Sequence, residues 1–153
     1  MKLDEIDRAI LDRLQREARI SNVQLAERVH LSESACLRRV RALEEAGVIA
    51  GYAALLDPAQ VDLPASVFVH LTLQRQDQAG LDAFEEAVQG IPEVMECFLM
   101  TGEFDYLMRV VVADAADFER VHRQHLTRLP AVARVQSSFA LRTVRKTPVL
   151  PVY

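Results

Sequence analysis

The sequence is poor in the residue types that several protein classes require. It has no tryptophan, and only two cysteines, Cys36 and Cys97, occur among its 153 residues. Two cysteines make neither a disulfide framework nor a zinc site, so we expect a reducing, cytoplasmic setting. No apolar run approaches the ~20 residues that span a bilayer. The opening residues Met1–Glu5 are polar and acidic, so we expect neither a membrane anchor nor a secretory signal.

The chain does have the composition of a folded protein, with its charges unevenly distributed. Half of the residues are hydrophobic and 26% are charged, which excludes wholesale disorder. The 18 basic and 22 acidic residues give a net charge of −4. Residues 1–47 carry nine of each sign, so the acidic surplus lies entirely in residues 48–153. A locally neutral part with clustered arginines is compatible with a DNA footprint despite the acidic total.

Apolar residues recur at helical spacing at the start of the chain. Leu3, Ile6, Ile10 and Leu14 are three or four residues apart and predict one helix that ends near Arg19. The stripe occupies a single face, so this helix is expected to pack against others.

Two serines predict the starts of two further helices. Ser21 and Ser32 each stand where an N-cap belongs, and Gly47 follows the third helix as its C′ residue. A tight turn at His30 separates the second and third helices, which is the layout of a helix-turn-helix. The inner face of the third helix is expected to hold Leu37, Val40 and Leu43.

The period changes after Gly47. Val48–Leu56 has the pattern of an extended segment, either a short wing-like hairpin or a strand that leaves the domain. Asp57–Pro64 contains two prolines and is expected to be a hinge. We therefore expect a helix-turn-helix domain over residues 1–50, an extended linker over 51–64 and a second domain over 65–153.

The second domain alternates strands and helices. Strands are predicted at Ser66–Gln74, Val94–Met100, Tyr106–Val112 and Val132–Val144, and helices around Leu81–Val88 and Phe118–Leu129. This βαββαβ order predicts a ferredoxin-like α+β sandwich with both helices on one face of the sheet. One helical layer is not expected to cover the apolar strand residues Met95, Cys97, Leu99, Met108, Val110 and Val112. The uncovered surface favours a homodimer.

Several segments match the signature of one protein family. In the N-terminal part they are Leu3–Leu11, Ala18–Asn22, Leu31–Val40 and Leu43–Ile49. In the C-terminal part they are Thr101–Tyr106, which fits a Gly-x-x-Asp-Tyr motif, Ser137–Phe139, Lys146-Thr147 and Leu150-Pro151. On these residues the chain resembles the Lrp/AsnC (feast/famine) family of transcriptional regulators, and Cys36–Val40 resembles its leucine-responsive branch. Glu33 departs from the proline that many members carry, which leaves its position relative to DNA open.

The resemblance carries expectations about fold, partners and activity. It implies a three-helix winged helix-turn-helix joined to a ferredoxin-like effector and oligomerisation domain. It implies a sequence-specific regulator of amino-acid metabolism that binds double-stranded DNA in the cytoplasm, is not an enzyme and uses no cofactor. It also implies a homodimer, an octamer of four dimers, and a small amino-acid effector held at the interface between subunits.

The third helix is expected to place its first residues against base edges in the major groove. With its inner face fixed as above, the residues turned outward are Ser34, Ala35, Arg38, Arg39 and Ala42. Arg38 is the candidate base reader because a guanidinium matches the O6/N7 pair of guanine. The candidate phosphate ligands are Arg39, Arg41, Ser32 and Ser34. Charge alone would favour a solvated helix face, and the helix-turn-helix context reverses that preference.

The Gly-x-x-Asp-Tyr segment has two readings. A glycine and an aspartate between two strands are ordinary hairpin chemistry. The resemblance favours an effector site instead, formed by Leu99, Met100, Thr101, Gly102, Phe104, Asp105, Tyr106, Gln136, Ser137 and Ser138. Backbone N–H groups around Gly102 would take the effector's carboxylate and Asp105 its ammonium group. The apolar members favour an effector such as leucine or methionine.

Other candidate sites are weaker. His122 and His125 have a spacing that can bind metal, but no matching ligand pair accompanies them. Cys36 reads as a packed small side chain. There are two rival functions: an enzyme like the sirohaem decarboxylases, which share this two-domain layout, and a metabolite-binding oligomer that has lost DNA binding. The first requires a cationic pocket with histidines, and the acidic C-terminal half and the arginines of the helix-turn-helix disfavour it. Tight sirohaem binding would favour the first. A DNA affinity that does not change when Arg38 and Arg39 are substituted would favour the second.

Overall fold

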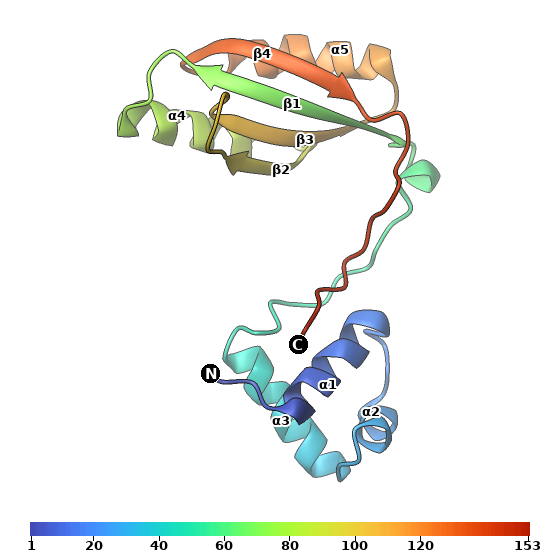
Figure 1. Ribbon diagram of the computed structural model, residues 1–153. Helices are drawn as coiled ribbons and strands as arrows, with labels where there is room; N and C mark the ends of the chain where they lie inside the picture. The colour runs from blue at the N-terminus through green and yellow to red at the C-terminus, as the bar shows by residue number, and fades with distance from the viewer. The chain divides into compact units, whose positions relative to one another are not determined.

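The computed structural model describes residues 1–153, which divide into two compact units (Figure 1). We call Met1–Leu55 with Val144–Tyr153 the N-terminal unit, and Leu56–Thr143 the sheet unit. None of the helices combines the length and the apolar composition that a membrane crossing requires.

The N-terminal unit is built on three helices, α1 (Glu5–Arg16), α2 (Asn22–Arg28) and α3 (Glu33–Glu45). Each begins at a side-chain cap: Asp4, Ser21 and Ser32 accept the backbone N–H three residues further on. The predicted caps of α2 and α3 are therefore confirmed. The first helix ends at Arg16, three residues before the predicted end.

The core of this unit corrects the predicted inner face of α3. Cys36 and Leu43 are completely buried and Val40 packs against the core, whereas Leu37 is 39% exposed. The sequence pattern cannot separate adjacent apolar residues such as Cys36 and Leu37. The smaller thiol side chain fits between the helices, and this rotates the leucine outward.

The segment after α3 is irregular. The Val48 and Ile49 N–H groups donate to the Leu43 carbonyl and close the helix, with Gly47 at φ +70°. Residues 48–57 contain no strand, so neither the hairpin nor the departing strand considered for Val48–Leu56 forms as a paired strand. The expected hinge contains a 3-10 turn over Pro58–Val61, begun by the Asp57 side chain.

The last ten residues depart from the expected domain boundary. Val144–Tyr153 groups with the N-terminal unit instead of with the sheet. The Gln15 amide of α1 donates to the Leu150 carbonyl at 3.1 Å and accepts from the Leu150 N–H at 2.6 Å. Val152 packs against the helical core. Gln15 thus supplies the pair of hydrogen bonds that a neighbouring strand would have given this extended segment.

The sheet unit has the predicted βαββαβ order. Its elements are β1 (Ala65–Leu73), α4 (Gln78–Gln89), β2 (Val94–Leu99), β3 (Tyr106–Val112), α5 (Ala115–Gln124) and β4 (Val132–Phe139). The strands pair antiparallel in the order β2-β3-β1-β4, and α4 and α5 pack on one face (Figure 1). The predicted ferredoxin-like sandwich is confirmed, although β4 ends five residues before the predicted Val144.

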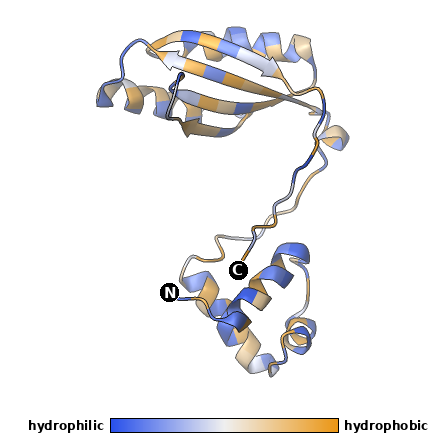
Figure 2. Ribbon diagram, in the orientation of Figure 1, coloured by the Kyte–Doolittle hydropathy of each residue, from blue (hydrophilic) through white to orange (hydrophobic).

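The strands alternate between a face that the helices cover and an open face (Figure 2). Met108, Val110 and Val112 are completely buried in the helix-covered core, so their predicted place on an uncovered surface is wrong. Met95 and Leu99 are exposed and Cys97 is half-buried. The open face instead carries Phe68 opposite Arg109. The period-2 pattern gave the alternation correctly but not which set the helices cover.

Candidate nucleic-acid interface and ligand pocket

The exposed side of α3 is polar and cationic. Ser34, Arg38 and Arg41 are exposed, and neither guanidinium has an ion-pair partner within the chain. Both are free to meet an anionic surface, because no internal carboxylate competes for them. The structure therefore keeps Arg38 and Arg41 available for the roles expected of them.

Arg39 is partly exposed but is held by two carboxylates at the start of α1. Its Nη1 donates to Asp4 Oδ2 at 2.7 Å and to Asp7 Oδ1 at 2.8 Å, and Asp7 is the one buried charged residue of the chain. The Asp4 and Asp7 hydrogen bonds raise the pKa of Arg39, and the Asp7 backbone N–H and then Arg39 lower that of Asp4. Arg39 ties α3 to the start of α1, which leaves its guanidinium less free for phosphate than the sequence suggested.

The start of α3 is held by local hydrogen bonds. Ser32 Oγ accepts the Ala35 N–H at 3.3 Å and lies 3.4 Å from Ser34 Oγ. The Asn22 side chain of α2 donates to the Glu33 carbonyl at 2.9 Å. Ser32 and Ala35 thus serve the helix cap, and Asn22 fixes the angle at which α3 leaves the turn.

The segment between β2 and β3 is fixed by Asp105. Its Oδ2 accepts the Leu73 N–H at 2.7 Å and its Oδ1 accepts from the Gln76 side chain at 2.8 Å. Both carboxylate oxygens therefore hold the segment against the end of β1, which leaves Asp105 less available for the effector's ammonium group than the sequence suggested. Gly102 has φ +113°, a conformation that a side chain would strain, and its N–H lies in an exposed turn.

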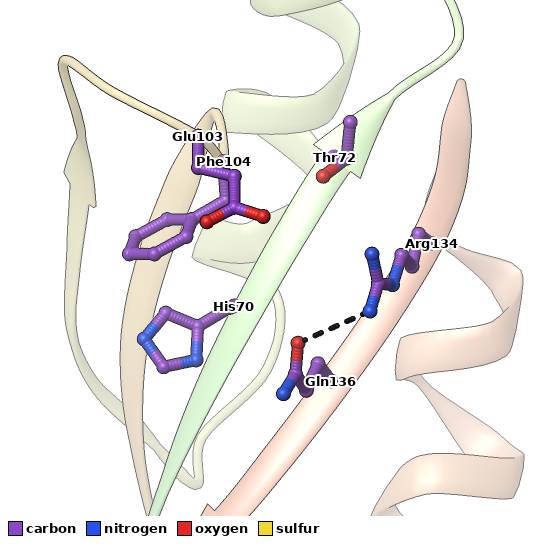
Figure 3. Close-up of a pocket in the computed structure, with 6 residues that line it drawn as sticks. All are labelled: His70, Thr72, Glu103, Phe104, Arg134 and Gln136. Carbon is purple, nitrogen blue, oxygen red and sulfur yellow. Dashed lines mark hydrogen bonds between the residues drawn. The ribbon is translucent and has the colours of Figure 1, made fainter.

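A pocket of about 210 Å³ lies on the open face of the sheet beside this segment (Figure 3). Its lining comes from β1, β4 and the β2–β3 segment and consists of His70, Thr72, Glu103, Phe104, Arg134 and Gln136. The strand register explains the grouping, because His70 pairs with Gln136 and Thr72 with Arg134. Of the predicted effector residues, only Phe104 and Gln136 line this pocket.

The pocket combines one charge of each sign with an aromatic wall. The Arg134 guanidinium contacts only Gln136, at 3.5 Å, and Glu103 has no ion-pair partner. The rings of His70 and Phe104 are in tilted contact, with centroids 4.1 Å apart and planes at 59° (Figure 3). His70, Thr72, Glu103 and Arg134 were not among the predicted effector residues. Polar residues at alternate positions of otherwise apolar strands were the signal for His70, Thr72 and Arg134, and Glu103 lies within the Thr101–Tyr106 motif.

Other predicted effector residues lie elsewhere. Tyr106 is buried in the helix-covered core, where its hydroxyl donates to Glu85 at 2.7 Å and burial raises its pKa. Leu99 pairs with Tyr106 in register and lines a second cavity of about 210 Å³ with Cys97. Burial and Glu85 raise the pKa of the Cys97 thiol to about 11. This cavity is separate from the open-face pocket.

The remaining expected residues divide between the surfaces. Ser138 pairs with Phe68 and shares the open face, whereas Ser137 pairs with the buried Val69 and points the other way. Met100 and Thr101 are exposed at the turn.

The histidines and cysteines form no additional centre. No group of three or more His, Cys, Asp or Glu residues is placed to hold a metal ion. His122 stands beside Phe118, with ring centroids 6.1 Å apart. Burial raises the pKa of Cys36, which packs in the helical core.

Comparison with known proteins covers both units. Residues 3–50 match the winged helix-turn-helix DNA-binding family and residues 66–150 the Lrp/AsnC ligand-binding domain. The chain is 52% identical over 116 residues to an HTH-type transcriptional regulator of Sinorhizobium fredii, covering 76% of this chain and 91% of the relative. It is 43% identical over 145 residues to the leucine-responsive regulatory protein of Escherichia coli K12, covering 95% and 88%. A transcriptional regulator of Neisseria meningitidis, solved in complex with L-Met, has a TM-score of 0.93 at 40% identity, covering 98% and 97%.

Proposed function

The chain belongs to the Lrp/AsnC family of transcriptional regulators, and we propose that it binds a specific double-stranded DNA site under the control of an α-amino acid. The DNA site is α3, and the effector site is the open-face pocket together with the β2–β3 segment. The observation that carries the proposal is that Arg38 and Arg41, on the second helix of a helix-turn-helix, are exposed and have no ion-pair partner within the chain.

On DNA, the two arginines have different tasks. Arg38, the sixth of the 13 residues of α3, reads guanine through a bidentate contact, while Arg41, one turn further along, holds a phosphate. Ser34 adds a hydroxyl to the same face. One such helix has little contact area, so two copies of the chain bind together, with their α3 helices about one DNA turn apart.

The pocket suits the head group of an amino acid. Arg134 binds the effector's carboxylate and Glu103 its ammonium group, since each side chain lacks a competing ion-pair partner. Asp105 holds the segment in place, and the exposed N–H of Gly102 adds a donor for the carboxylate. The side chain of leucine or methionine packs against the His70–Phe104 pair. A second copy completes the apolar part of the site.

The regulatory mechanism is linkage between the two sites. The amino acid binds one arrangement of subunits better than another and thereby changes how paired α3 helices are spaced. We propose a homodimer that assembles further into an octamer of four dimers, acts in the cytoplasm, and has no enzymatic activity or cofactor.

Two measurements test these sites. Selection from random DNA should yield a roughly palindromic site, and its absence would contradict DNA recognition. A calorimetric screen of the twenty standard amino acids should find a binder whose affinity falls about tenfold or more in Arg134→Gln and in Glu103→Gln, because each loses a charged contact. Arg142→Gln, which changes an exposed arginine without an ion pair, is the control. Equal affinities in all three variants would contradict the pocket.

A further inference from the structure

Leu37 is the one large apolar side chain of α3 that the core leaves unused. Cys36 and Leu43 are fully buried and Val40 packs against the core, whereas Leu37 is 39% exposed and contributes to neither cluster of buried residues. Half-exposed leucines are common on protein surfaces. This one is distinguished by its neighbours.

The neighbours of Leu37 form the DNA-facing side of α3. Counted from Leu37, Ser34 lies three residues before, Arg38 one residue after and Arg41 four residues after. The helical repeat therefore places all four side chains at adjoining positions on the helix surface. Leu37 is the fifth residue of the helix, within the part that approaches base edges in a helix-turn-helix complex. It therefore enters the groove with the arginines.

The polar surroundings favour DNA over a protein partner. An interface between proteins presents a contiguous apolar patch. Leu37 is instead a single apolar group among a serine hydroxyl and two unpaired guanidinium groups, which attract phosphate and base acceptors. DNA offers one apolar group at this depth of the major groove, the C5-methyl of thymine.

We propose that Leu37 contacts a thymine methyl group within one or two base pairs of the guanine that Arg38 reads. This inference rests on the proposed DNA-binding function and adds a second base to its recognition code. Arg38 discriminates by hydrogen bonding, and Leu37 discriminates by excluding water from an apolar contact. The selected site is expected to contain the same thymine in each half.

Replacing thymine by uracil removes only that methyl group and so isolates the contact. The selected DNA site is synthesised with uracil in place of each thymine in turn, and the full-length wild-type protein is titrated with each duplex. At one thymine of each half-site, uracil is expected to weaken binding about fourfold, which is the value of one buried methyl-sized group. In Leu37→Ala, affinity for the unmodified site falls by at least that factor and the uracil penalty at this position disappears.

Val48→Ala is the matched control, because Val48 has the same 39% exposure and lies beyond the end of α3. It is expected to retain the uracil penalty. Leu37→Met keeps an apolar side chain of similar size and also retains the penalty, which separates loss of the contact from loss of folding. Circular dichroism verifies that each variant is folded.

The outcomes are distinct from those for the function itself. If no DNA sequence is selected, the proposed function fails and this contact with it. If a site is selected but uracil carries no penalty anywhere, or the penalty persists in Leu37→Ala, only the methyl contact is overturned. A change of oligomer size in Leu37→Ala with an unaltered uracil penalty would likewise overturn it and assign Leu37 to a contact between copies.

Discussion

Two adjacent arginines of α3 show how far neighbouring residues of one charge can differ in role. Arg38 is exposed and unpaired, whereas Arg39 bonds Asp4 and the buried Asp7. Removing Arg39 leaves the Asp7 carboxylate buried without its cation, and we expect the free energy of unfolding of the N-terminal unit to fall by about 1–3 kcal/mol. Chemical denaturation followed by circular dichroism measures this. Arg38→Ala is the control and is expected to change stability by less than about 0.5 kcal/mol. Equal stability of the two variants would refute the division of roles.

The thiol of Cys97 gives a prediction about pH. Burial and the nearby Glu85 carboxylate raise its pKa from 9.0 to about 11, so at pH 8 the thiol is more fully protonated than an ordinary cysteine. The thiolate is the reacting species, and its fraction at pH 8 is about a hundredfold lower than in the unfolded chain. Its higher basicity makes it more nucleophilic, so labelling by a disulfide reagent is expected to be about tenfold slower or more. The rate should rise about tenfold per pH unit up to that pKa. Cys97→Ser leaves the buried Cys36 as the reference. Fast labelling of Cys97 at pH 8 would contradict the raised pKa.

Among the elements, the C-terminal segment Val144–Tyr153 has a role that the sequence did not predict, because it packs with the N-terminal unit. Gln15 holds Leu150 by two hydrogen bonds and Val152 joins the helical core. A chain that ends at Pro148 loses the Gln15–Leu150 hydrogen bonds and the packing of Val152. We expect the free energy of local opening of α1 to fall by roughly 1–2 kcal/mol, so that its amides exchange hydrogen faster. Amides of α4, in the sheet unit, serve as the internal reference. Tyr153→Ala, which alters a side chain that is 91% exposed, is expected to leave exchange unchanged. Unaltered exchange in the truncated chain would show that the segment does not brace α1.

The elements also show what the sequence could reveal. The caps Ser21 and Ser32 and the βαββαβ order depend on residues close in sequence, and they were predicted correctly. The prediction of which face of α3 meets the core was wrong at Cys36 and Leu37, where two adjacent apolar residues compete for one place in the core. The prediction of the open-face pocket was incomplete because Arg134 comes into the pocket only through the pairing of β1 with β4. That register depends on contacts between distant segments, which local patterns do not encode.

At the scale of the whole molecule, a net charge of −4 coexists with two exposed, unpaired arginines, Arg38 and Arg41, on α3. Acidic residues repel DNA at long range, so the proposed binding would depend on Arg38 and Arg41, the unpaired arginines of α3. The salt dependence of affinity therefore distinguishes two kinds of contact. Contacts to phosphate release counterions and set the dependence on salt, whereas contacts to bases contribute specificity.

Different salt dependences are consequently predicted for substitutions of Arg38 and Arg41, the two unpaired arginines of α3. In Arg41→Ala, the slope of log affinity against log salt concentration is expected to become shallower by about 1.8, because two copies each lose one phosphate contact worth about 0.9. Arg38→Ala is expected to lower affinity for the selected site by about thirtyfold or more while nearly keeping the slope, because two copies each lose one guanine contact worth about 1–3 kcal/mol. Fluorescence anisotropy at several salt concentrations measures both variants against wild type. Arg142→Ala, outside the helix, should match wild type. If Arg38→Ala flattens the slope and Arg41→Ala relaxes base preference, the two assignments must be exchanged. If neither changes binding, α3 does not face DNA.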